Sequence, residues 1–290
     1  MHIGHVALQV PDVDQYVTFA QQAFGLRVTE RSDSEALLSA GPKHHELQVL
    51  AGEAPGFDHV GLELPSEAAL ADLRGAVEEA GIRVEEGSEQ AGIDASIRFV
   101  GPGGISYEAY TGMVREPLSF DGFARPLVRR LGHLTFLSVD HLAIEEFWGS
   151  VLGMRLSDRL GPVTWMRCDA DHHGLAVGPH PEATVLHHHA WETQDFSSMG
   201  RYCDHLSELD MRLLWGPVRH GPGFNLATYL PEPTGATVEV YSDLLRILDD
   251  DSYVPVDWDG NEHALNLWGP PAPEEFLAVG VPVLGATYVG

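Results

Sequence analysis

Residues 217–241 read PVRHGPGFNLATYLPEPTGATVEVY. Pro233-Thr234-Gly235 is a turn signal between two strand-like segments, so the stretch predicts a β-hairpin. Glu239 interrupts the alternation from Thr237 to Tyr241, and a charged side chain inside a strand needs a partner. A metal ion is one candidate for that partner.

The hairpin belongs to an internal repeat that covers most of the chain. Residues 233–241 correspond to residues 102–110, and both segments end in a glutamate followed two positions later by a tyrosine. Three pairs of residues recur at nearly constant separations of 128, 129 and 131 positions: His5 and His133, His59 and His188, and Glu108 and Glu239. A repeat of this length predicts two homologous domains.

Each copy of the repeat is patterned as β-α-β-β-β modules. The alternation from Gly4 to Val10 predicts a strand, and the amphipathic segment between Asp12 and Gly25 predicts a helix. Ser66 is the N-cap candidate of the second module's helix. The sequence therefore predicts an α+β fold of two homologous domains, each of two βαβββ modules forming a cupped mixed sheet. The predicted boundaries are 1–118 for the first domain, 119–128 for a linker, 129–245 for the second domain and 246–290 for a tail or lid.

Composition and charge narrow the function. The 290 residues carry 43 Asp and Glu against 17 Lys and Arg, which gives a net charge of −26 and argues against nucleic acid or anionic membrane as a partner. No apolar run is long enough to span a membrane. The two cysteines, Cys168 and Cys203, form neither a disulfide framework nor a zinc motif. We expect a cytoplasmic protein.

His133, His188 and Glu239 are the metal-ligand set that the repeat singles out. A single histidine on a strand is usually not a ligand, but here all three residues fall at repeated positions. We expect them on equivalent edge strands that converge inside the cup. Two imidazoles and one carboxylate form a facial triad with open positions, which suits non-haem Fe(II), although Mn(II) accepts the same ligand types.

The sequence resembles the type I extradiol ring-cleaving dioxygenases of the vicinal oxygen chelate superfamily, the group of catechol 2,3-dioxygenase and homoprotocatechuate 2,3-dioxygenase. The most specific part is His220, Tyr229, Glu232-Pro233-Thr234-Gly235 and Glu239, which follow the family's order. The resemblance implies the iron ligands named above. It also implies an acid–base role for His173, with His172 as the alternative, and substrate-positioning roles for His220 and Tyr229.

What the resemblance implies for function is Fe(II)-dependent extradiol cleavage of a catecholic compound, with insertion of both atoms of O2, in aromatic catabolism. It also implies a homo-oligomer and a lid formed by the tail. Trp165 matches a pocket residue of the homoprotocatechuate group, or is simply a core aromatic. Thr135 and Trp215 replace an Asn and an Arg of that group, which favours an uncharged or differently substituted catechol. The alternative function is a non-redox metal-dependent enzyme (isomerase, lyase or hydrolase) or a small-molecule binding protein of the same fold.

The first domain keeps His5, His59 and Glu108 at the ligand positions and His45 at the place of His173. Residues 89–98, which correspond to the segment with His220 and Tyr229, contain no His or Tyr. We therefore expect the first domain to be non-catalytic and its triad to be a relic. In the second domain we expect His187 and His189, which flank His188, to face away from the metal.

Overall fold

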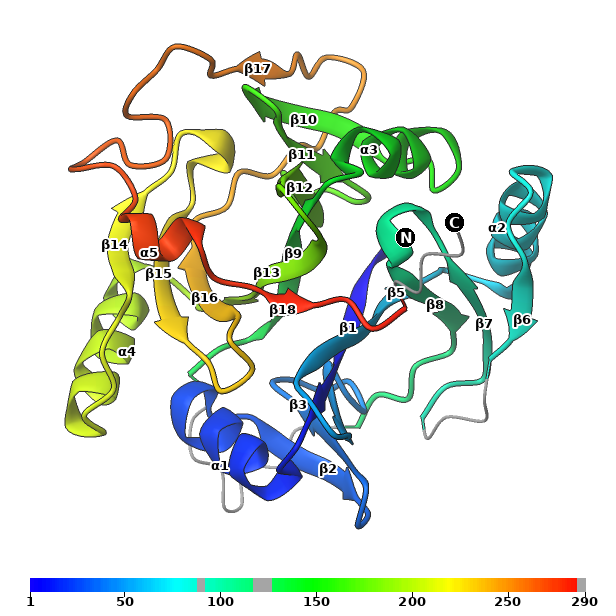
Figure 1. Ribbon diagram of the computed structural model, residues 1–290, viewed down its shortest axis with the longest axis horizontal. Helices are drawn as coiled ribbons and strands as arrows, with labels where there is room; N and C mark the ends of the chain where they lie inside the picture. The colour runs from blue at the N-terminus through cyan, green and yellow to red at the C-terminus, as the bar shows by residue number, and fades with distance from the viewer. Residues whose placement is uncertain (88–91, 117–126, 286–290) are drawn as a thin grey trace.

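A computed structural model describes residues 1–87, 92–116 and 127–285 of the chain. It consists of two mixed β-sheets with helices on their outer faces (Figure 1). Both sheets have the same strand order, so the predicted fold of two homologous βαβββ pairs is confirmed. Most of the predicted linker, 119–128, lies outside the described residues, and the predicted boundary there stays a prediction.

The first sheet has the strand order β2-β3-β4-β1-β5-β8-β7-β6. Its elements are β1 (His2–Val10), α1 (Val13–Phe24), β2 (Arg27–Arg31), β3 (Glu35–Ser39), β4 (Leu47–Ala51), β5 (Gly56–Glu63), α2 (Glu67–Glu79), β6 (Val84–Glu86), β7 (Ala95–Val100), the short 3-10 helix η1 (Pro102–Gly104) and β8 (Ser106–Thr111).

The second sheet repeats this order with tail strands added. Written from the same end as the first sheet, it reads β17-β10-β11-β12-β9-β13-β16-β15-β14, with β18 paired to β13. Its elements are β9 (Arg130–Ser138), α3 (His141–Ser150), β10 (Arg155–Leu160), β11 (Val163–Arg167), β12 (Leu175–Pro179), β13 (Thr184–Glu192), α4 (Phe196–Glu208), β14 (Trp215–Arg219), η2 (Pro222–Phe224), β15 (Leu226–Pro231) and β16 (Thr237–Ser242). In the tail lie β17 (Val256–Asp257), α5 (Glu274–Leu277) and β18 (Val281–Pro282).

The helices of the first domain begin and end where their capping residues predict. The Asp12 side chain accepts a hydrogen bond from the backbone N–H of Gln15, and Gly25 ends α1 with a φ of 71°, a left-handed conformation that favours glycine. Ser66 caps α2 in the same way through the N–H of Ala69. Each helix buries one apolar face, with Val13, Tyr16, Val17, Ala20, Ala23 and Phe24 buried in α1 and Leu70, Leu73 and Val77 in α2.

The triad strands lie at the centre of the second sheet, not at its edges as we expected. β13 pairs with β9 on one side and with β16 on the other. Ala190 of β13 pairs with both His133 and Glu239, which therefore flank it, and His188 lies two residues along the same face. Parallel pairing of β13 with β16 is a long-range contact, which is why local patterning did not reveal it.

The two domains share a continuous hydrophobic core. At their interface Phe57 packs edge-to-face on Phe136, and Trp148 Nε1 donates a hydrogen bond to Tyr107 Oη at 2.7 Å. The Tyr16 hydroxyl of α1 donates to the buried Glu232 carboxylate of the second domain. These contacts join the two domains through buried side chains.

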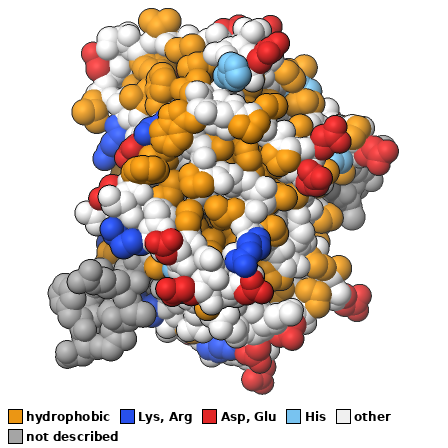
Figure 2. Space-filling model, turned by 90° about the vertical axis from the view of Figure 1, so that its left-hand side faces the viewer, with side chains coloured by type: hydrophobic (Ala, Val, Ile, Leu, Met, Phe, Trp, Pro, Cys, Tyr) orange, Lys and Arg blue, Asp and Glu red, His pale blue; other side chains and the backbone are white. Residues whose placement is uncertain are grey.

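The tail wraps the outside of the second domain and then crosses toward the first (Figure 1). The face that contains α4, β14 and the tail carries many apolar side chains, and charged side chains lie mainly on its lower half and its edges (Figure 2). Exposed apolar residues on its elements include Phe196, Trp268 and Leu277. None of the helices in the described residues has the length and apolar character needed to cross a membrane. Cys168 and Cys203 are both free.

Candidate metal centre and adjoining pocket

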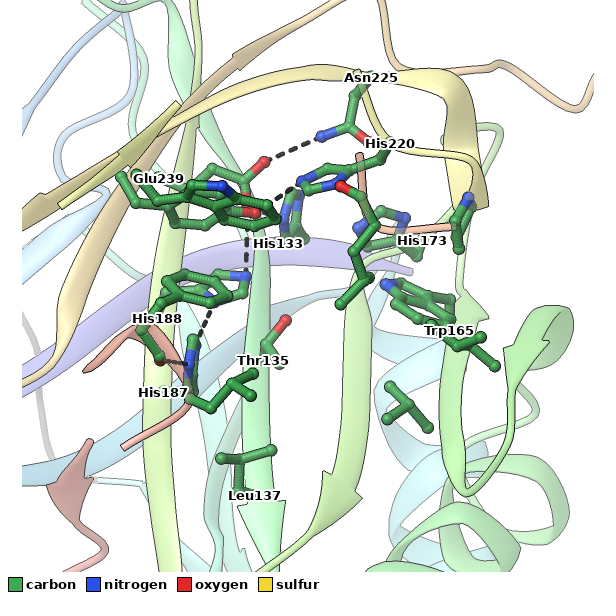
Figure 3. A pocket seen from close by; sticks show the side chains of 18 residues that line it. His133, Thr135, Leu137, Trp165, His173, His187, His188, His220, Asn225 and Glu239 are labelled. Atoms are coloured by element: carbon green, nitrogen blue, oxygen red, sulfur yellow. Dashed lines mark hydrogen bonds and ion pairs between the residues drawn. The ribbon is translucent and has the colours of Figure 1, made fainter. Parts of the chain in front are cut away.

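His133, His188 and Glu239 converge at one end of a pocket inside the second domain (Figure 3). Glu239 Oε2 lies 3.2 Å from the Nε2 atoms of both His133 and His188, and all three side chains are buried. In an octahedral complex with bonds of about 2.1 Å, neighbouring ligand atoms lie about 3.0 Å apart. The three donor atoms therefore fit a divalent ion bound by a facial triad.

Asn225 orients the carboxylate of this triad. Its Nδ2 donates a 2.9 Å hydrogen bond to Glu239 Oε1, which leaves Oε2 for the ion (Figure 3). Burial alone would raise the pKa of Glu239, but His133 and His188 hold it well below its usual value. The carboxylate is therefore ionised. Sequence reasoning missed Asn225 because the first-domain copy has Asp94 at the corresponding place.

His187 orients His188, contrary to the expectation that it faces away. A break in the β9–β13 register between Leu186 and His188 turns both imidazoles toward the pocket. His187 Nε2 lies 2.8 Å from the Phe276 carbonyl, which can only accept, so His187 Nε2 is the donor. Burial lowers the pKa of His187 to about 3, so its Nδ1 is a bare acceptor.

The proton on His188 is placed by this contact. His188 Nδ1 lies 2.7 Å from His187 Nδ1 and must donate to it, so His188 Nε2 presents its lone pair toward Glu239. A metal-binding histidine commonly has its other nitrogen fixed in this way. His189 does face away, as predicted, with Nε2 3.0 Å from Glu232.

His173 lies beside the triad, with its ring centroid 4.3 Å from that of His133. Its Nδ1 is 3.0 Å from Nδ1 of His172, and His172 Nε2 is 3.2 Å from Asp158 Oδ2. The Asp158 carboxylate favours the tautomer of His172 that carries its proton on Nε2. His172 Nδ1 is then the acceptor and His173 Nδ1 the donor of the hydrogen bond between them, so His173 Nε2 carries no proton. Burial lowers the pKa of His173 well below its usual value. The structure thus lines the pocket with His173 and makes His172 its support.

Asp158 is itself held by the tail. It accepts hydrogen bonds from Tyr253 Oη at 3.1 Å, the Val256 N–H at 2.9 Å and Trp258 Nε1 at 2.9 Å. Burial would raise its pKa, but His172 and Trp258 lower it. The tail therefore contributes to the position of His173 through two intermediate side chains.

His220 and Tyr229 form a hydrogen-bonded pair on the other side of the pocket. His220 Nδ1 donates to the Leu265 carbonyl at 2.7 Å, so its Nε2 accepts from the Tyr229 hydroxyl at 2.8 Å. Burial lowers the pKa of His220, and burial together with Glu239 raises that of Tyr229 well above its usual value. At neutral pH the pair is a neutral imidazole and a neutral phenol.

The pocket has a volume of about 130 Å³ and an apolar wall. Thr135, Trp165 and Trp215 all line it, so Trp165 belongs to the pocket wall. Trp215 stacks on Tyr229 with ring centroids 5.4 Å apart. Phe276 of the tail is another lining residue, and no Lys or Arg lies among the lining residues of the described chain. An apolar cavity of about 150 Å³ can hold one benzene molecule.

The first domain contains a second cluster of the same kind. His5, His59 and Glu108 are buried, and their donor atoms converge as those of the second domain do. The His45 ring lies 4.9 Å from that of His5, in the arrangement of His173 and His133. The segment that corresponds to His220 lies partly outside the described residues, and Arg98 takes the place of Tyr229 because each pairs with the glutamate of its triad.

Comparisons with known proteins agree on the relatives of this chain. Biphenyl-2,3-diol 1,2-dioxygenase of Metapseudomonas furukawaii is 26% identical over 257 residues, covering 82% of this chain and 84% of the relative. The manganese-dependent 2,3-dihydroxybiphenyl 1,2-dioxygenase of Geobacillus genomosp. 3 is 26% identical, covering 89% and 90%. The iron-dependent extradiol dioxygenase of Rhodococcus jostii is 24% identical, covering 92% and 95%.

Solved structures share the fold over nearly the whole chain. Native homoprotocatechuate 2,3-dioxygenase from Arthrobacter globiformis superposes with a TM-score of 0.86 at 22% identity, covering 98% of this chain and 92% of that one. A Mn(II)-bound glyoxalase from Novosphingobium aromaticivorans gives a TM-score of 0.83 at 26% identity, covering 94% and 93%. Residues 2–109 and 130–240 match the Glyoxalase/Bleomycin resistance protein/Dioxygenase superfamily. The chain belongs to this superfamily, and type I extradiol dioxygenases are its homologues over most of its length.

Proposed function

We propose that this protein is an Fe(II)-dependent extradiol dioxygenase that cleaves the ring of an uncharged, single-ring catechol and inserts both atoms of O2. One observation carries the proposal. The triad of His133, His188 and Glu239 lies in a ring-sized apolar pocket that also contains His173 and the pair of His220 and Tyr229. A protein that only binds a ligand has no need of acid–base groups beside a metal.

The triad and His173 have different roles in the proposed reaction. A divalent ion held by the triad would supply open coordination positions for a catechol and for dioxygen and would pass electrons between them. His173, neutral and with Nε2 free, accepts the proton of a catechol hydroxyl and returns a proton as the ring opens. The support of its Nδ1 by His172 keeps the base at Nε2.

The pair of His220 and Tyr229 positions the substrate oxygen. The Tyr229 hydroxyl donates a hydrogen bond to His220 Nε2, so its oxygen can still accept a hydrogen bond from the substrate. When a substrate oxygen gains negative charge, the same hydroxyl can turn and donate to it instead. Stacking on Trp215 and contact with Phe276 hold the Tyr229 ring in place. Tyr229 is therefore a preorganised donor.

Size and charge of the pocket favour the proposed substrate class. The volume of about 130 Å³ suits one aromatic ring, and the wall contains Leu137, Val163, Trp165 and Trp215. A carboxylate on the ring would find no cationic partner among the lining residues that the structure describes, and burying it unpaired is unfavourable. We expect kcat/KM to be higher for catechol or a methylcatechol than for a catechol with a carboxylate side chain.

The metal is proposed as Fe(II), with Mn(II) as the alternative. One relative is named as iron-dependent and another as manganese-dependent, and both ions accept two imidazoles and a carboxylate. The alternative function is a non-redox metal-dependent reaction, which the similarity to a Mn(II)-bound glyoxalase favours. We further propose that the tail residues Leu265 and Phe276, which line the pocket, act as its lid.

A direct experiment separates these functions. The protein is loaded anaerobically with Fe(II) or Mn(II), separated from free metal, and mixed with oxygenated buffer and a panel of catechols. The proposal expects oxygen uptake and a yellow ring-opened product, both lost in E239Q. If no catechol gives oxygen uptake with either ion, while a metal-dependent non-oxidative conversion is found, the alternative holds.

A further inference from the structure

The first domain has its own set of three converging donor atoms. His5 Nε2 lies 2.9 Å from His59 Nε2, and Glu108 Oε2 lies 3.4 Å and 3.3 Å from these two nitrogens. The two glutamate–histidine contacts of the second domain are both 3.2 Å. From this match we propose that His5, His59 and Glu108 bind a second divalent transition-metal ion, in a buried site that stabilises the fold and takes no part in the oxygenase reaction.

Neighbouring side chains orient two of the three proposed ligands. Asp58 Oδ1 lies 2.6 Å from His59 Nδ1, so His59 donates there and presents the lone pair of Nε2 to Glu108. Glu108 Oε1 accepts hydrogen bonds from Ser96 Oγ at 3.0 Å and from Arg98 Nε at 3.3 Å. Both ligands are therefore oriented from outside, as His187 and Asn225 orient the ligands of the second domain.

Several buried polar atoms in and beside the cluster lack hydrogen-bond partners in the protein itself. Glu108 Oε2 accepts no hydrogen bond from the described residues, although two imidazoles face it, and His5 Nδ1 and His45 Nε2 also lack partners there. The side chains of His5, His59 and Glu108 are at most 1% exposed. Burying a carboxylate without full compensation is unfavourable, and a divalent ion on Glu108 Oε2 removes that cost.

The surroundings of the site make it unsuitable for the reaction of the second domain. Arg98 occupies the position of Tyr229, so a permanent cation replaces the neutral phenol beside the triad glutamate. Gly61 replaces Ala190, and a Cβ at Gly61 would lie 2.2 Å from His5 Nδ1, so the His5 ring packs directly on the backbone of β5. The charges of Asp58 and Arg98 offset each other, which leaves the net charge of the ion-bound cluster equal to that of the second domain.

Metal stoichiometry tests the proposal independently of any catechol reaction. The full-length protein is loaded anaerobically with Mn(II), separated from free ion, and analysed for metal per chain, together with the isosteric variants E108Q and E239Q and their double mutant. We expect two ions in the wild type, one in each single variant and none in the double mutant. The control H45Q, at a buried histidine outside the triad, should keep two ions.

Two results would overturn the proposal. One is a single ion in the wild type and none in E239Q, which would leave the first-domain triad without metal. The other is two ions in a folded E108Q, which would place the second ion elsewhere. If E108Q does not fold, E239Q still decides, because one retained ion supports a first-domain site and no ion contradicts it. Folding of each variant is checked by circular dichroism.

Discussion

Replacing His187 by phenylalanine tests how the protein prepares His188 for a metal ion. In the wild type His187 accepts at Nδ1 from His188 Nδ1 at 2.7 Å and donates from Nε2 to the Phe276 carbonyl at 2.8 Å. Phenylalanine keeps an aromatic ring at this buried position but removes both nitrogens. The ring already packs edge-to-face on Phe276, with centroids 4.7 Å apart, so a phenyl group is accommodated there.

The H187F substitution destabilises the ion-bound state more than the ion-free state. Without an ion, His188 can carry its proton on Nε2 and donate to Glu239 Oε2, 3.2 Å away, so the loss of the acceptor is partly relieved. With an ion on Nε2 the proton must stay on Nδ1, and in H187F that buried donor has no acceptor, which costs about 1–3 kcal/mol. Each 1.4 kcal/mol is about tenfold in affinity. We expect the dissociation constant of the ion to rise about 10- to 100-fold, the range found when such supporting residues are lost.

The first domain supplies a matched rescue. Asp58 occupies the position of His187 and accepts from His59 Nδ1 at 2.6 Å. H187D should therefore restore most of the affinity, because a carboxylate accepts from His188 Nδ1 as the imidazole does. The assay is an anaerobic competition between protein and a chromophoric chelator for Mn(II), in an E108Q background so that only the second-domain triad is titrated. An H187F affinity within about twofold of wild type, or equal losses in H187F and H187D, would refute the role of this hydrogen bond.

Three further predictions concern proton transfer, the phenol donor and the domain interface. H173Q should lower kcat by about 10²- to 10⁴-fold with unchanged metal content, because the base at Nε2 is lost; an oxygen electrode measures this, and a near-normal kcat would exclude His173 as the base. Y229F should lower kcat by about 10²- to 10³-fold with little change in KM, and equal effects on both would contradict a role limited to the transition state. E232Q should lose about 1–3 kcal/mol at pH 7, since Glu232 accepts from Tyr16 and pairs with His189. Because these partners hold the pKa of Glu232 below its usual value, that stability is present above the unfolded pKa of about 4.3 and is lost progressively as the pH falls from there through the lower folded pKa. Urea unfolding at pH 7 and pH 3.5 should therefore show the difference between E232Q and wild type shrinking with acid, and an undiminished difference would contradict it.

Much of the fold and the triad could be predicted because they rest on local pattern and on repetition. Asp12 caps α1 with its side chain and Gly25 ends it in a left-handed conformation, so α1 follows from the sequence. The triad follows from the recurrence of His5, His59 and Glu108 at His133, His188 and Glu239. Repetition shows which residues correspond, although it does not show which strands are neighbours.

The supports of the site could not be predicted because they depend on irregular or non-repeated features. His187 faces the pocket only because the register of β13 breaks before His188, and strict alternation predicted the opposite. Leu265 and Phe276 act through backbone carbonyls, which every residue has, so the sequence carries no sign of their role. Both also lie in the tail, outside the repeat, where no second copy offers a comparison.

The fate of the two oxygen atoms shows whether the protein is an extradiol dioxygenase. The protein is loaded anaerobically with Fe(II), mixed with catechol under ¹⁸O2, and the ring-opened product is reduced at once to prevent exchange and analysed by mass spectrometry. We expect one O2 to be consumed per catechol and both labelled atoms to appear in a product cleaved beside the diol. Absence of oxygen uptake with every catechol tested, or a product without label, would contradict it.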